Sequence, residues 1–341
     1  MQLNKDVKID WDDISLIPDV ISNINSRSEI DPFINNKLPL FVAPMDMVVN
    51  SKNAENFYEN GINVCLPRSI KYDDLLNKNY FYSYGLDEII DIVKNNGFLP
   101  NKVLIDVANG HMKKLLDIAR IIKKERNIEL MAGNIANPKT YREYCEIGID
   151  YIRVGIGGGS VCTTSANVSI HYPMASLIME CNNISKEYDN PTKIVADGGF
   201  KNYADIIKAI ALGAHYVMLG SIFNKAIESA GNNYLYQNEK YSSINEQQAI
   251  ELFNLGENIY KYYRGMSTKE VQKHWNKKEL KTSEGITKYN KVEYTITSWV
   301  ENFTDYIKSA MSYCGAKNLN EFRGEAEWVI ISQHAFNRFN K

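Results

Sequence analysis

The chain has 341 residues, of which 44% are hydrophobic, and its 39 basic residues nearly balance its 41 acidic residues. This composition is ordinary for a globular protein with a sizeable core, so it argues against a disordered chain. The near-neutral charge, without a basic stripe interleaved with aromatic residues, argues against a nucleic-acid or membrane surface and favours a small-molecule partner.

The N-terminus and the cysteines both indicate a cytoplasmic protein. The first residues, MQLNKDVKIDWDD, contain no apolar signal region, and no later run is long enough to span a bilayer. The five cysteines are an odd number and show neither a CxxC pair nor metal-ligand spacing. They fit a reducing compartment better than a disulfide framework or a structural zinc site.

Short apolar runs recur along the chain, and each of them ends in Gly, Asn or Asp and precedes a helical pattern. In chain order they are PLFVAPMD, INVCLP, KVLIDVANG, IELMAGNI, YIRVGIGGG, KIVADGG and HYVMLGS. Their length and their β-branched residues indicate buried parallel strands. Between them lie amphipathic segments such as MKKLLDIARIIKKE and NYADIIKAIALGA, whose apolar residues recur every three to four positions.

These seven strand and helix units, with room for an eighth, predict a single (β/α)8 TIM barrel over residues 1–341. A doubly wound sheet is the alternative fold. That fold would need fewer strands and an early glycine fingerprint that opens a helix, and no such fingerprint is visible.

In a barrel, polar residues at the carboxyl ends of the strands share one site. We expect this site to contain Asp106, Asn109, Asn134, Gly157, Asp197, Gly220 and Ser221. The last two predicted strands end in the glycine-rich loops ADGGF and MLGS, and each loop precedes a helix. Barrels bind phosphate through backbone amides in such loops. Asp197 could accept ribose hydroxyls there, or it could cap the following helix.

The segment RVGIGGGSVCTTSAN, residues 153–167, places Cys162 just after Gly157, Gly158 and Gly159. Glycines allow backbone N–H groups or carbonyls to converge on a phosphate or a cation. A thiol in such a loop would lie beside a bound ligand. The other interpretation is that Cys162 is a small buried hydrophobic residue, which is the usual role of a free cysteine.

The alternation of strands and helices stops between residues 224 and 290. This segment is polar and rich in Tyr, Asn and Lys. Long insertions on the catalytic face of a barrel are often lids, so we predict a flap within the single catalytic domain. A disordered surface loop is the alternative.

Ten motifs together resemble one protein family in their order and spacing: SRSEID, APMD, DVANGH, MAGN, GIGGGSVCTT, ADGG, VMLGS, YRGMS, TSEG and SYCGA. The family is that of IMP dehydrogenase and GMP reductase, and the resemblance covers nearly the whole chain. It implies a barrel enzyme, a homotetramer, in which a cysteine attacks C2 of the purine of a bound nucleotide. A nicotinamide cofactor exchanges a hydride at the same carbon.

The resemblance also implies roles for individual residues. It makes Cys162 the nucleophile, and Thr164 and Glu284 the pair that moves protons to or from the group at C2. The residues that resemble phosphate contacts are Ser160, Gly199, Gly220, Ser221 and Tyr263. Asp197 resembles the ribose contact, and the base-binding strip corresponds to Gly265, Met266 and Ser267.

Cofactor and metal sites are implied in the same way. The cofactor would be held by Asp106, Asn109 and Asn134, with Lys281 at a flap position where reductases tend to have arginine. A potassium ion would be bound by the backbone carbonyls of Gly157, Gly159 and Cys162. Nothing near Cys162 in the sequence supplies a cation that would favour its thiolate form.

Two features favour the reductase branch of the family. The dehydrogenases usually carry a regulatory module of paired small domains near the position of Arg68, and between Arg68 and Lys102 we expect only a helix or two. They also carry an Arg-Tyr pair in the flap, and residues 268–283 contain neither Arg nor Tyr. We therefore expect NADPH-dependent reductive deamination of GMP to IMP and ammonia. The SYCGA segment is more like the dehydrogenases, so NAD-dependent oxidation of IMP to XMP stays the alternative.

Several positions depart from the family pattern. Ser165 stands in place of Arg, Met174 in place of Gln, and Asn232 in place of a common Glu, while Ser169 and His171 stand in place of glycines. Either the pocket is reshaped for a deoxy or modified guanine nucleotide, or these positions lie outside it. A nucleotide-binding protein without turnover is a further alternative, against which the intact Cys162, Thr164 and Glu284 argue.

Overall fold

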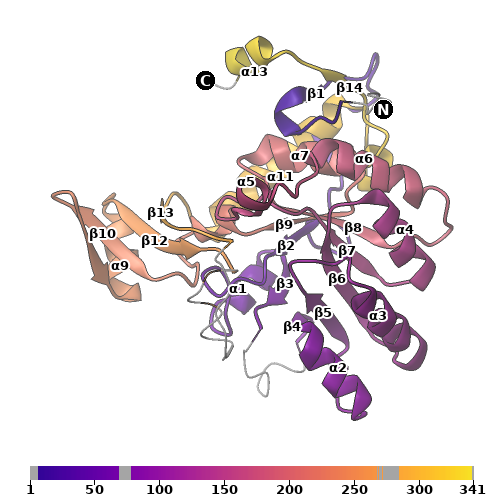
Figure 1. Ribbon diagram of the computed structural model, residues 1–341. Helices are drawn as coiled ribbons and strands as arrows, with labels where there is room; N and C mark the ends of the chain where they lie inside the picture. The colour runs from indigo at the N-terminus through magenta and orange to yellow at the C-terminus, as the bar shows by residue number, and fades with distance from the viewer. Residues whose placement is uncertain (1–6, 69–77, 267, 269–270, 272–283, 340–341) are drawn as a thin grey trace.

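The computed structural model describes residues 7–68, 78–266, 268, 271 and 284–339, and the features below are those of these residues. Its centre is a closed barrel of parallel strands that pair in chain order (Figure 1). The barrel strands are β2 (Leu40–Val42), β3 (Asn63–Leu66), β4 (Phe81–Tyr84), β5 (Lys102–Asp106), β6 (Glu129–Ile135), β7 (Tyr151–Val154), β8 (Lys193–Asp197) and β9 (Tyr216–Leu219). The predicted (β/α)8 barrel is confirmed.

Strand β4 and helix α2 correct one expectation. They lie between Arg68 and Lys102, where the sequence indicated only a helix or two. Strand β4 has the sequence FYSY, and all four of its residues are buried. Strand β4 is short and contains no aliphatic residue, so it lacks the β-branched or aliphatic run that indicated the other strands. It is the third barrel strand in chain order, and it completes the eight strands of which the sequence indicated seven.

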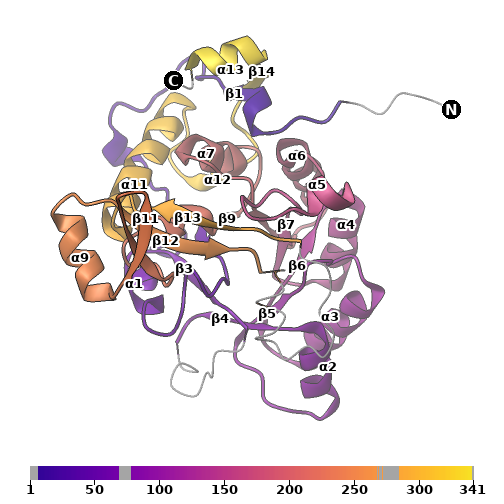
Figure 2. The ribbon, with the colours of Figure 1, turned by 60° about the vertical axis from the view of Figure 1, so that its left-hand side comes forward.

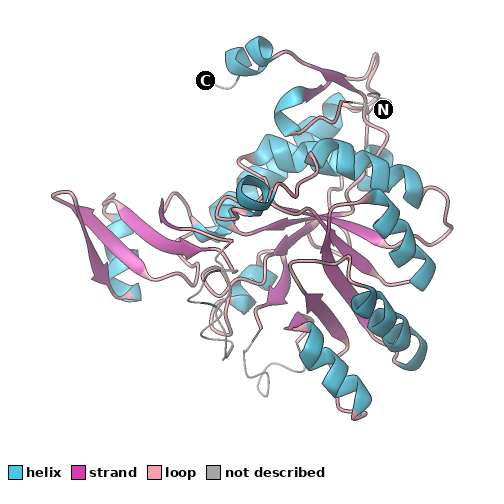
Figure 3. Ribbon diagram, in the orientation of Figure 1, coloured by secondary structure: helices cyan, strands magenta, loops and turns pink. Residues whose placement is uncertain are grey.

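Helices cover the outside of the barrel (Figures 2 and 3). On helix α3, the buried residues Leu115, Ile118, Ala119 and Ile122 form one apolar stripe that faces the strands. The helices of this layer and of the loops above it are α1 (Ala54–Glu59), α2 (Leu86–Lys94), α3 (Lys113–Glu125), α4 (Pro138–Ile147), α5 (Thr164–Val168), α6 (Met174–Ser185), α7 (Tyr203–Ala211), α8 (Ser221–Asn224), α11 (Ile296–Tyr313) and α12 (Leu319–Phe322).

Large aromatic side chains fill the barrel at the amino ends of its strands. Phe41 lies with its ring centroid 5.7 Å from that of Phe81 and 5.1 Å from that of Tyr216, and Tyr151 packs against all three. These rings belong to a buried cluster inside the barrel. Because this end is filled, a ligand has room only at the carboxyl ends of the strands.

The two ends of the described chain meet in a small antiparallel sheet. Strand β1 (Ile14–Leu16) pairs with β14 (Trp328–Ile330). The 3-10 helix η1 (Trp11–Asp13) precedes β1 and contacts helix α13 (Gln333–Phe339), whereas the 3-10 helix η2 (Arg27–Glu29) contacts α11. Trp11 stacks on Phe200 with ring centroids 5.5 Å apart, so this segment supports the loop after β8. None of the helices in the described part of the chain has both the length and the apolar character needed to cross a membrane.

Much of the insertion over residues 224–290 folds as an arm that extends away from the barrel (Figure 1). Its four strands pair antiparallel in the order β11 (Lys240–Ile244), β10 (Asn233–Gln237), β12 (Ile259–Arg264) and β13 (Thr287–Lys291). Helix α9 (Glu246–Asn254) packs Ala249 against Ile259 on one face of this sheet. Strands β12 and β13 run back to the barrel, so the arm carries residues to its carboxyl end.

A buried lysine lies on β12 of the arm. Lys261 is 1% exposed, and its ammonium donates a hydrogen bond to the carbonyl of Ser229 at 2.5 Å. Burial lowers the pKa of Lys261 to about 8, although the charges of Glu246 and Glu228 oppose the shift. The arm therefore contains an ammonium that is costly to bury at neutral pH.

We expect the Lys261→Met variant to remove a pH dependence of stability. The pKa of Lys261 is about 8 in the folded chain against 10.5 for an exposed lysine, so between these values the unfolded chain binds more protons. The free energy of unfolding of the wild type should therefore rise with pH, relative to Lys261→Met, by about 2–3 kcal/mol between pH 7 and pH 10. Urea unfolding at several pH values measures this difference. The exposed Lys291→Met is the control, and a parallel pH dependence of wild type and Lys261→Met would contradict the prediction.

Candidate active site

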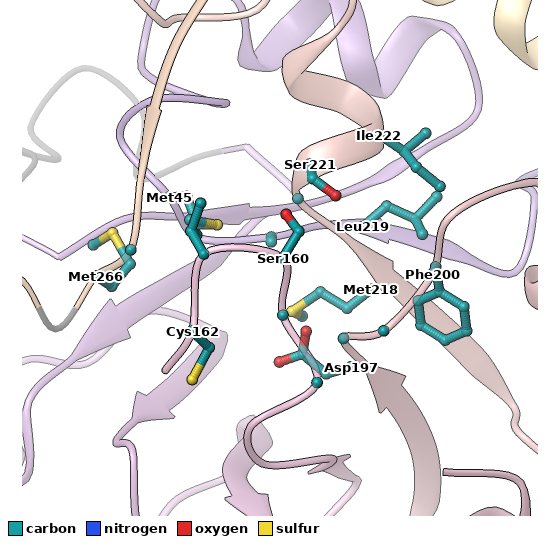
Figure 4. A pocket seen from close by; sticks show the side chains of 18 of the residues that line it. Met45, Ser160, Cys162, Asp197, Phe200, Met218, Leu219, Ser221, Ile222 and Met266 are labelled. Atoms are coloured by element: carbon teal, nitrogen blue, oxygen red, sulfur yellow. The ribbon is translucent and has the colours of Figure 1, made fainter. Parts of the chain in front are cut away.

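A cavity of about 300 Å³ opens at the carboxyl ends of the barrel strands (Figure 4). This volume is at the lower end of the range for small-molecule sites. The structure brings to its wall ten residues that the sequence predicted for the site: Ser160, Cys162, Asp197, Gly199, Gly220, Ser221, Tyr263, Gly265, Met266 and Glu284. These residues lie at or after the ends of the barrel strands β7, β8 and β9, and on the two segments that join the arm to the barrel, at the end of β12 and just before β13.

The sequence did not single out the apolar part of the wall. Met45 and Met218 line the cavity beside the predicted Met266, and Figure 4 shows all three side chains around it. Met45 lies within the APMD motif, but a methionine carries no chemical signal of a binding role. The sulfur of Met45 accepts a hydrogen bond from the Tyr263 hydroxyl at 3.3 Å, which connects β2 to the arm.

Two glycine loops form one side of the cavity by packing backbone against backbone. A Cβ atom at Gly198 would lie 3.2 Å from the backbone nitrogen of Gly159, and Gly198 has a φ of +100°. Gly199 has a φ of +85°, which also favours glycine. The loops after β7 and β8 therefore meet closely enough to leave backbone N–H groups at the cavity wall.

Cys162, Thr164 and Glu284 form a connected line of side chains. The Cys162 thiol donates to the Thr164 hydroxyl, with Sγ and Oγ1 3.3 Å apart. The Thr164 hydroxyl donates in turn to the Glu284 carboxylate, with Oγ1 and Oε2 2.6 Å apart. The main chain holds the same groups together, because the Thr163 N–H donates to the Glu284 carbonyl at 3.0 Å and Cys162 bridges to Gly285.

This line of hydrogen bonds gives the Cys162 proton a path to a carboxylate. A thiolate, not a thiol, is the nucleophile of a reactive cysteine. The sequence showed no cation near Cys162 that would favour its thiolate form, whereas the structure places the Glu284 carboxylate two hydrogen bonds away from the thiol. The arrangement can therefore support nucleophilic attack by sulfur and the return of a proton to a leaving group.

The surroundings of Cys162 differ from those of the other cysteines, all of which the structure describes as free thiols. Cys65 and Cys181 are buried, and burial raises the pKa of each. Cys162 is half-buried and is the one cysteine among the residues that line the cavity. The interpretation of Cys162 as a buried hydrophobic residue is therefore wrong.

A cluster of charged residues adjoins the cavity at Asp197. Arg153 on β7 bridges two carboxylates: its Nη1 lies 2.5 Å from Oδ1 of Asp106, and its Nη2 lies 2.8 Å from Oδ2 of Asp197. The Asn134 amide donates to the same Asp197 oxygen at 2.7 Å and to the Gly155 carbonyl at 2.8 Å. Arg153 was not among the residues predicted for the site, although an arginine inside an apolar strand indicates a polar partner.

The charges of this cluster stabilise one another. Burial alone would raise the pKa of Asp106, but the charges of Arg153 and Arg68 outweigh it and lower that pKa. Burial would lower the pKa of Arg153, but Asp197 and Asp106 raise it. Asp106 and Arg153 are therefore both charged at neutral pH, and the contacts of Arg153 and Asn134 with Oδ2 hold Asp197 in a fixed orientation.

Asp197 keeps one carboxylate oxygen for a ligand. The side chains of Arg153 and Asn134 donate hydrogen bonds to its Oδ2 atom. Its Oδ1 atom has no hydrogen-bond partner among the described residues. The alternative role, a cap for the following helix, is wrong because Asn202 caps α7. Asp197 also lines the cavity, so Oδ1 is available to hydroxyl groups.

The remaining predicted residues lie at different distances from the cavity. Asp106, Asn134 and Thr164 contact residues of its wall or of the adjoining cluster without lining it, and Gly157 directly precedes the wall residue Gly158. Asn109 is exposed, and its side chain accepts a hydrogen bond from the His111 N–H at 3.0 Å. Ser267 and Lys281 lie outside the described residues.

Two of the three backbone carbonyls expected to bind potassium accept a hydrogen bond from their own loop. The Gly157 carbonyl accepts a hydrogen bond from the Ser165 hydroxyl at 3.1 Å, and the Gly159 carbonyl accepts one from the Cys162 N–H at 2.9 Å. Each carbonyl oxygen keeps a second lone pair, so the potassium site stays a prediction. No step proposed below depends on a potassium ion.

The departures from the family pattern around Cys162 lie outside the cavity. The Ser165 hydroxyl binds the Gly157 carbonyl, and His171 lies 3.1 Å from the Ile156 carbonyl. Ser169 ends α5 with a φ of +58°, and Met174 is 1% exposed in the core. None of these four residues lines the cavity, so they supply no group to its wall.

Comparison with known proteins gives two kinds of match. Residues 99–339 match the family model of the IMP dehydrogenase / GMP reductase domain. The GMP reductase of Staphylococcus saprophyticus is 30% identical over 352 aligned residues, which cover 96% of this chain and 97% of the reductase. The IMP dehydrogenase of Chlorobaculum parvum is 33% identical over 231 residues, which cover 67% of this chain and 45% of the dehydrogenase. The chain therefore spans less than half the length of the dehydrogenases that it matches.

Proposed function

The chain belongs to the IMP dehydrogenase and GMP reductase family, and within this family we propose that it is a GMP reductase that converts GMP to IMP and ammonia with NADPH. The observation that carries the proposal is the match to a GMP reductase over 96% of this chain and 97% of the relative. A second observation supports it. Only residues 67–80 separate β3 from β4, which is too short a connection for a pair of regulatory domains.

We place the nucleotide in the cavity with its phosphate at the glycine loops. Ser160, Ser221 and Tyr263 offer hydroxyl groups there, beside the backbone of Gly199 and Gly220. Burial raises the pKa of Tyr263, so its phenol stays protonated and can donate to a phosphate oxygen. The free Oδ1 of Asp197 accepts the ribose hydroxyls, and the base lies along Gly265 and Met266 toward Cys162.

The charged cluster suits a nicotinamide cofactor. Asp106 offers a carboxylate for ribose hydroxyls, and Asn134 offers an amide, with Asn109 and Lys281 as the other residues assigned to this role. Asp106 has a side-chain exposure of 14%, and its two oxygens, which are paired with Arg153 and Arg68, keep further lone pairs for hydroxyl groups. When bound, the cofactor supplies the hydride that replaces the amino group at C2.

The catalytic residues handle sulfur and protons. The Cys162 thiol gives its proton through Thr164 to Glu284 as sulfur bonds to C2 of guanine. The bond from C2 to the exocyclic nitrogen then breaks, and Glu284 returns the proton through Thr164 so that ammonia leaves. After C2 is reduced, its bond to sulfur breaks, which releases IMP and leaves the Cys162 thiolate. The thiol proton departs with ammonia, and one proton from solvent converts the thiolate back to the thiol before the next turnover.

Two observations favour NAD-dependent oxidation of IMP as the second candidate function. The Chlorobaculum parvum dehydrogenase is 33% identical over its matched segment, and the SYCGA segment resembles the dehydrogenases. The same Cys162 and Glu284 would serve either reaction. A deoxy or modified guanine nucleotide is a weaker candidate, because the departures that suggested it lie outside the cavity.

Steady-state assays with GMP, dGMP and IMP, each with NADPH, NADH, NAD and NADP, test the proposal. We expect the highest kcat/KM for GMP with NADPH, with IMP and ammonia formed in equal amounts to the cofactor consumed. Formation of XMP from IMP with NAD would instead identify a dehydrogenase. Nucleotide binding without turnover in any pair would contradict both candidates. The homotetramer and the cytoplasmic location stay predictions.

A further inference from the structure

Lys288 on β13 places an ammonium group at the edge of the cavity. Its Nζ lies 3.0 Å from the Ser160 hydroxyl oxygen and 5.7 Å from the centroid of the Tyr263 ring. Ser160 and Tyr263 both line the cavity, at the end where the glycine loops meet. The arm thus adds a cation to a wall otherwise built from hydroxyl groups and backbone.

This ammonium has no carboxylate partner among the described residues. Its described hydrogen-bond partner is the Ser160 hydroxyl, whereas the neighbouring Lys225 is paired with Glu293 at 2.9 Å. Burial, and then the charge of Lys225, lower the pKa of Lys288. A half-buried cation beside another cation is unfavourable unless an anion joins it, so the position suits an anionic ligand.

The hydrogen bonds leave donors directed at such a ligand. An ammonium has three N–H donors, and Lys288 uses one of them on Ser160. Ser160 accepts that hydrogen bond, so its own O–H stays available as a donor. An oxygen atom bound to Ser160 at about 2.7 Å would lie within about 6 Å of Nζ, well within the range of a flexible lysine side chain.

We infer that Lys288 binds the 5′-phosphate of the nucleotide together with Ser160, and that it selects phosphorylated ligands over unphosphorylated ones. The inference rests on the proposed function only in placing a phosphate at the glycine loops. A charge-assisted hydrogen bond to a phosphate oxygen is stronger than a neutral one, and it carries no information about the base. Lys288 is thus a specificity-determining residue for the phosphate, not for the purine.

Strand alternation provides a matched control. Lys288 and the buried Asn290 lie on the face of β13 toward the barrel, whereas Lys291 is exposed on the opposite face. Lys291→Met therefore removes the same charge from the same strand without reaching the cavity. Lys288→Met removes the cation, and Lys288→Arg keeps a positive charge at the position.

Calorimetric titration of the full chain with GMP, guanosine and ribose 5-phosphate tests the inference. We expect Lys288→Met to weaken GMP binding about 10–100-fold and guanosine binding less than about 3-fold, with Lys291→Met close to wild type. Lys288→Arg should recover most of the lost affinity. Ribose 5-phosphate lacks the base, so its weaker binding to Lys288→Met reports on the phosphate even if guanine is the wrong base.

Four results would overturn the inference. GMP affinity of Lys288→Met within about 3-fold of wild type would show that the ammonium does not bind phosphate. Equal loss for GMP and guanosine, or equal loss in Lys288→Arg and Lys288→Met, would assign Lys288 a structural role. Binding of guanosine but of neither phosphate ester by the wild type would exclude a phosphate at this end. By contrast, binding of ribose 5-phosphate without GMP turnover would contradict only the proposed function.

Discussion

Replacing Cys162 with alanine is expected to lower kcat by more than about 10⁴-fold while nucleotide binding stays measurable. The sulfur forms the bond to C2 in the proposed reaction, and the structure places no second thiol on the cavity wall within the described residues. Apart from Ser160, which lies on the same loop as Cys162, the phosphate and ribose contacts lie on the loops after β8 and β9 and on the arm, so they survive the change. Single-turnover kinetics with GMP and NADPH, paired with calorimetric titration of GMP, measure both quantities.

Cys314→Ala is the matched control for this variant. Cys314 is also a half-buried free thiol, but it follows α11 and lies 3.8 Å from the Ile17 carbonyl, outside the cavity wall. Its replacement should leave kcat unchanged. Turnover by Cys162→Ala within about 10-fold of wild type would rule out a covalent intermediate at this residue.

Thr164 and Glu284 are expected to act as one unit in proton transfer. We expect Thr164→Ala and Glu284→Gln each to lower kcat by about 10²–10⁴-fold. The double variant should lose little more, because either change breaks the path whose central hydrogen bond is 2.6 Å long. Steady-state kinetics of the four proteins complete a double-mutant cycle, which measures the coupling between the two side chains.

Thr163→Ala serves as the control for this cycle. The N–H of Thr163 donates to the Glu284 carbonyl at 3.0 Å, and alanine keeps that N–H while removing a neighbouring hydroxyl. Its effect on kcat should therefore be small. If the losses in Thr164→Ala and Glu284→Gln multiply in the double variant, the two residues act independently and the proton path is wrong.

The sequence allowed most barrel strands to be predicted because each is a short apolar run that is buried on both faces. The runs KVLIDVANG and KIVADGG contain β5 and β8, and both end in the polar residues that reach the site. The signal failed at β4, where FYSY offers aromatic rings in place of aliphatic residues. The four-stranded sheet of the arm was missed for a related reason, since its tyrosine-rich strands are polar in composition.

The residue types of the site could also be predicted, because glycine, cysteine and carboxylate at strand ends restrict the chemistry. Cys162 after three glycines indicated a reactive loop, and ten of the predicted residues line one cavity. The departures at Ser165 and Met174 were misleading, because their distance from the cavity depends on how the loop after Cys162 folds. Spacing along the chain carries no information on that distance.

What the sequence determined by itself is the order of strands and the identity of the groups at their carboxyl ends. These follow from local patterns of apolar residues and glycines, which act within a few positions of the chain. Only the tertiary structure decided which groups are partners. Thr164 and Glu284 are 120 positions apart and meet because β13 returns the arm to the loop after β7. Arg153 orients Asp197, and Lys288 reaches Ser160, for the same physical reason: charges and hydrogen bonds act through space, and only barrel closure and sheet pairing bring these residues within reach.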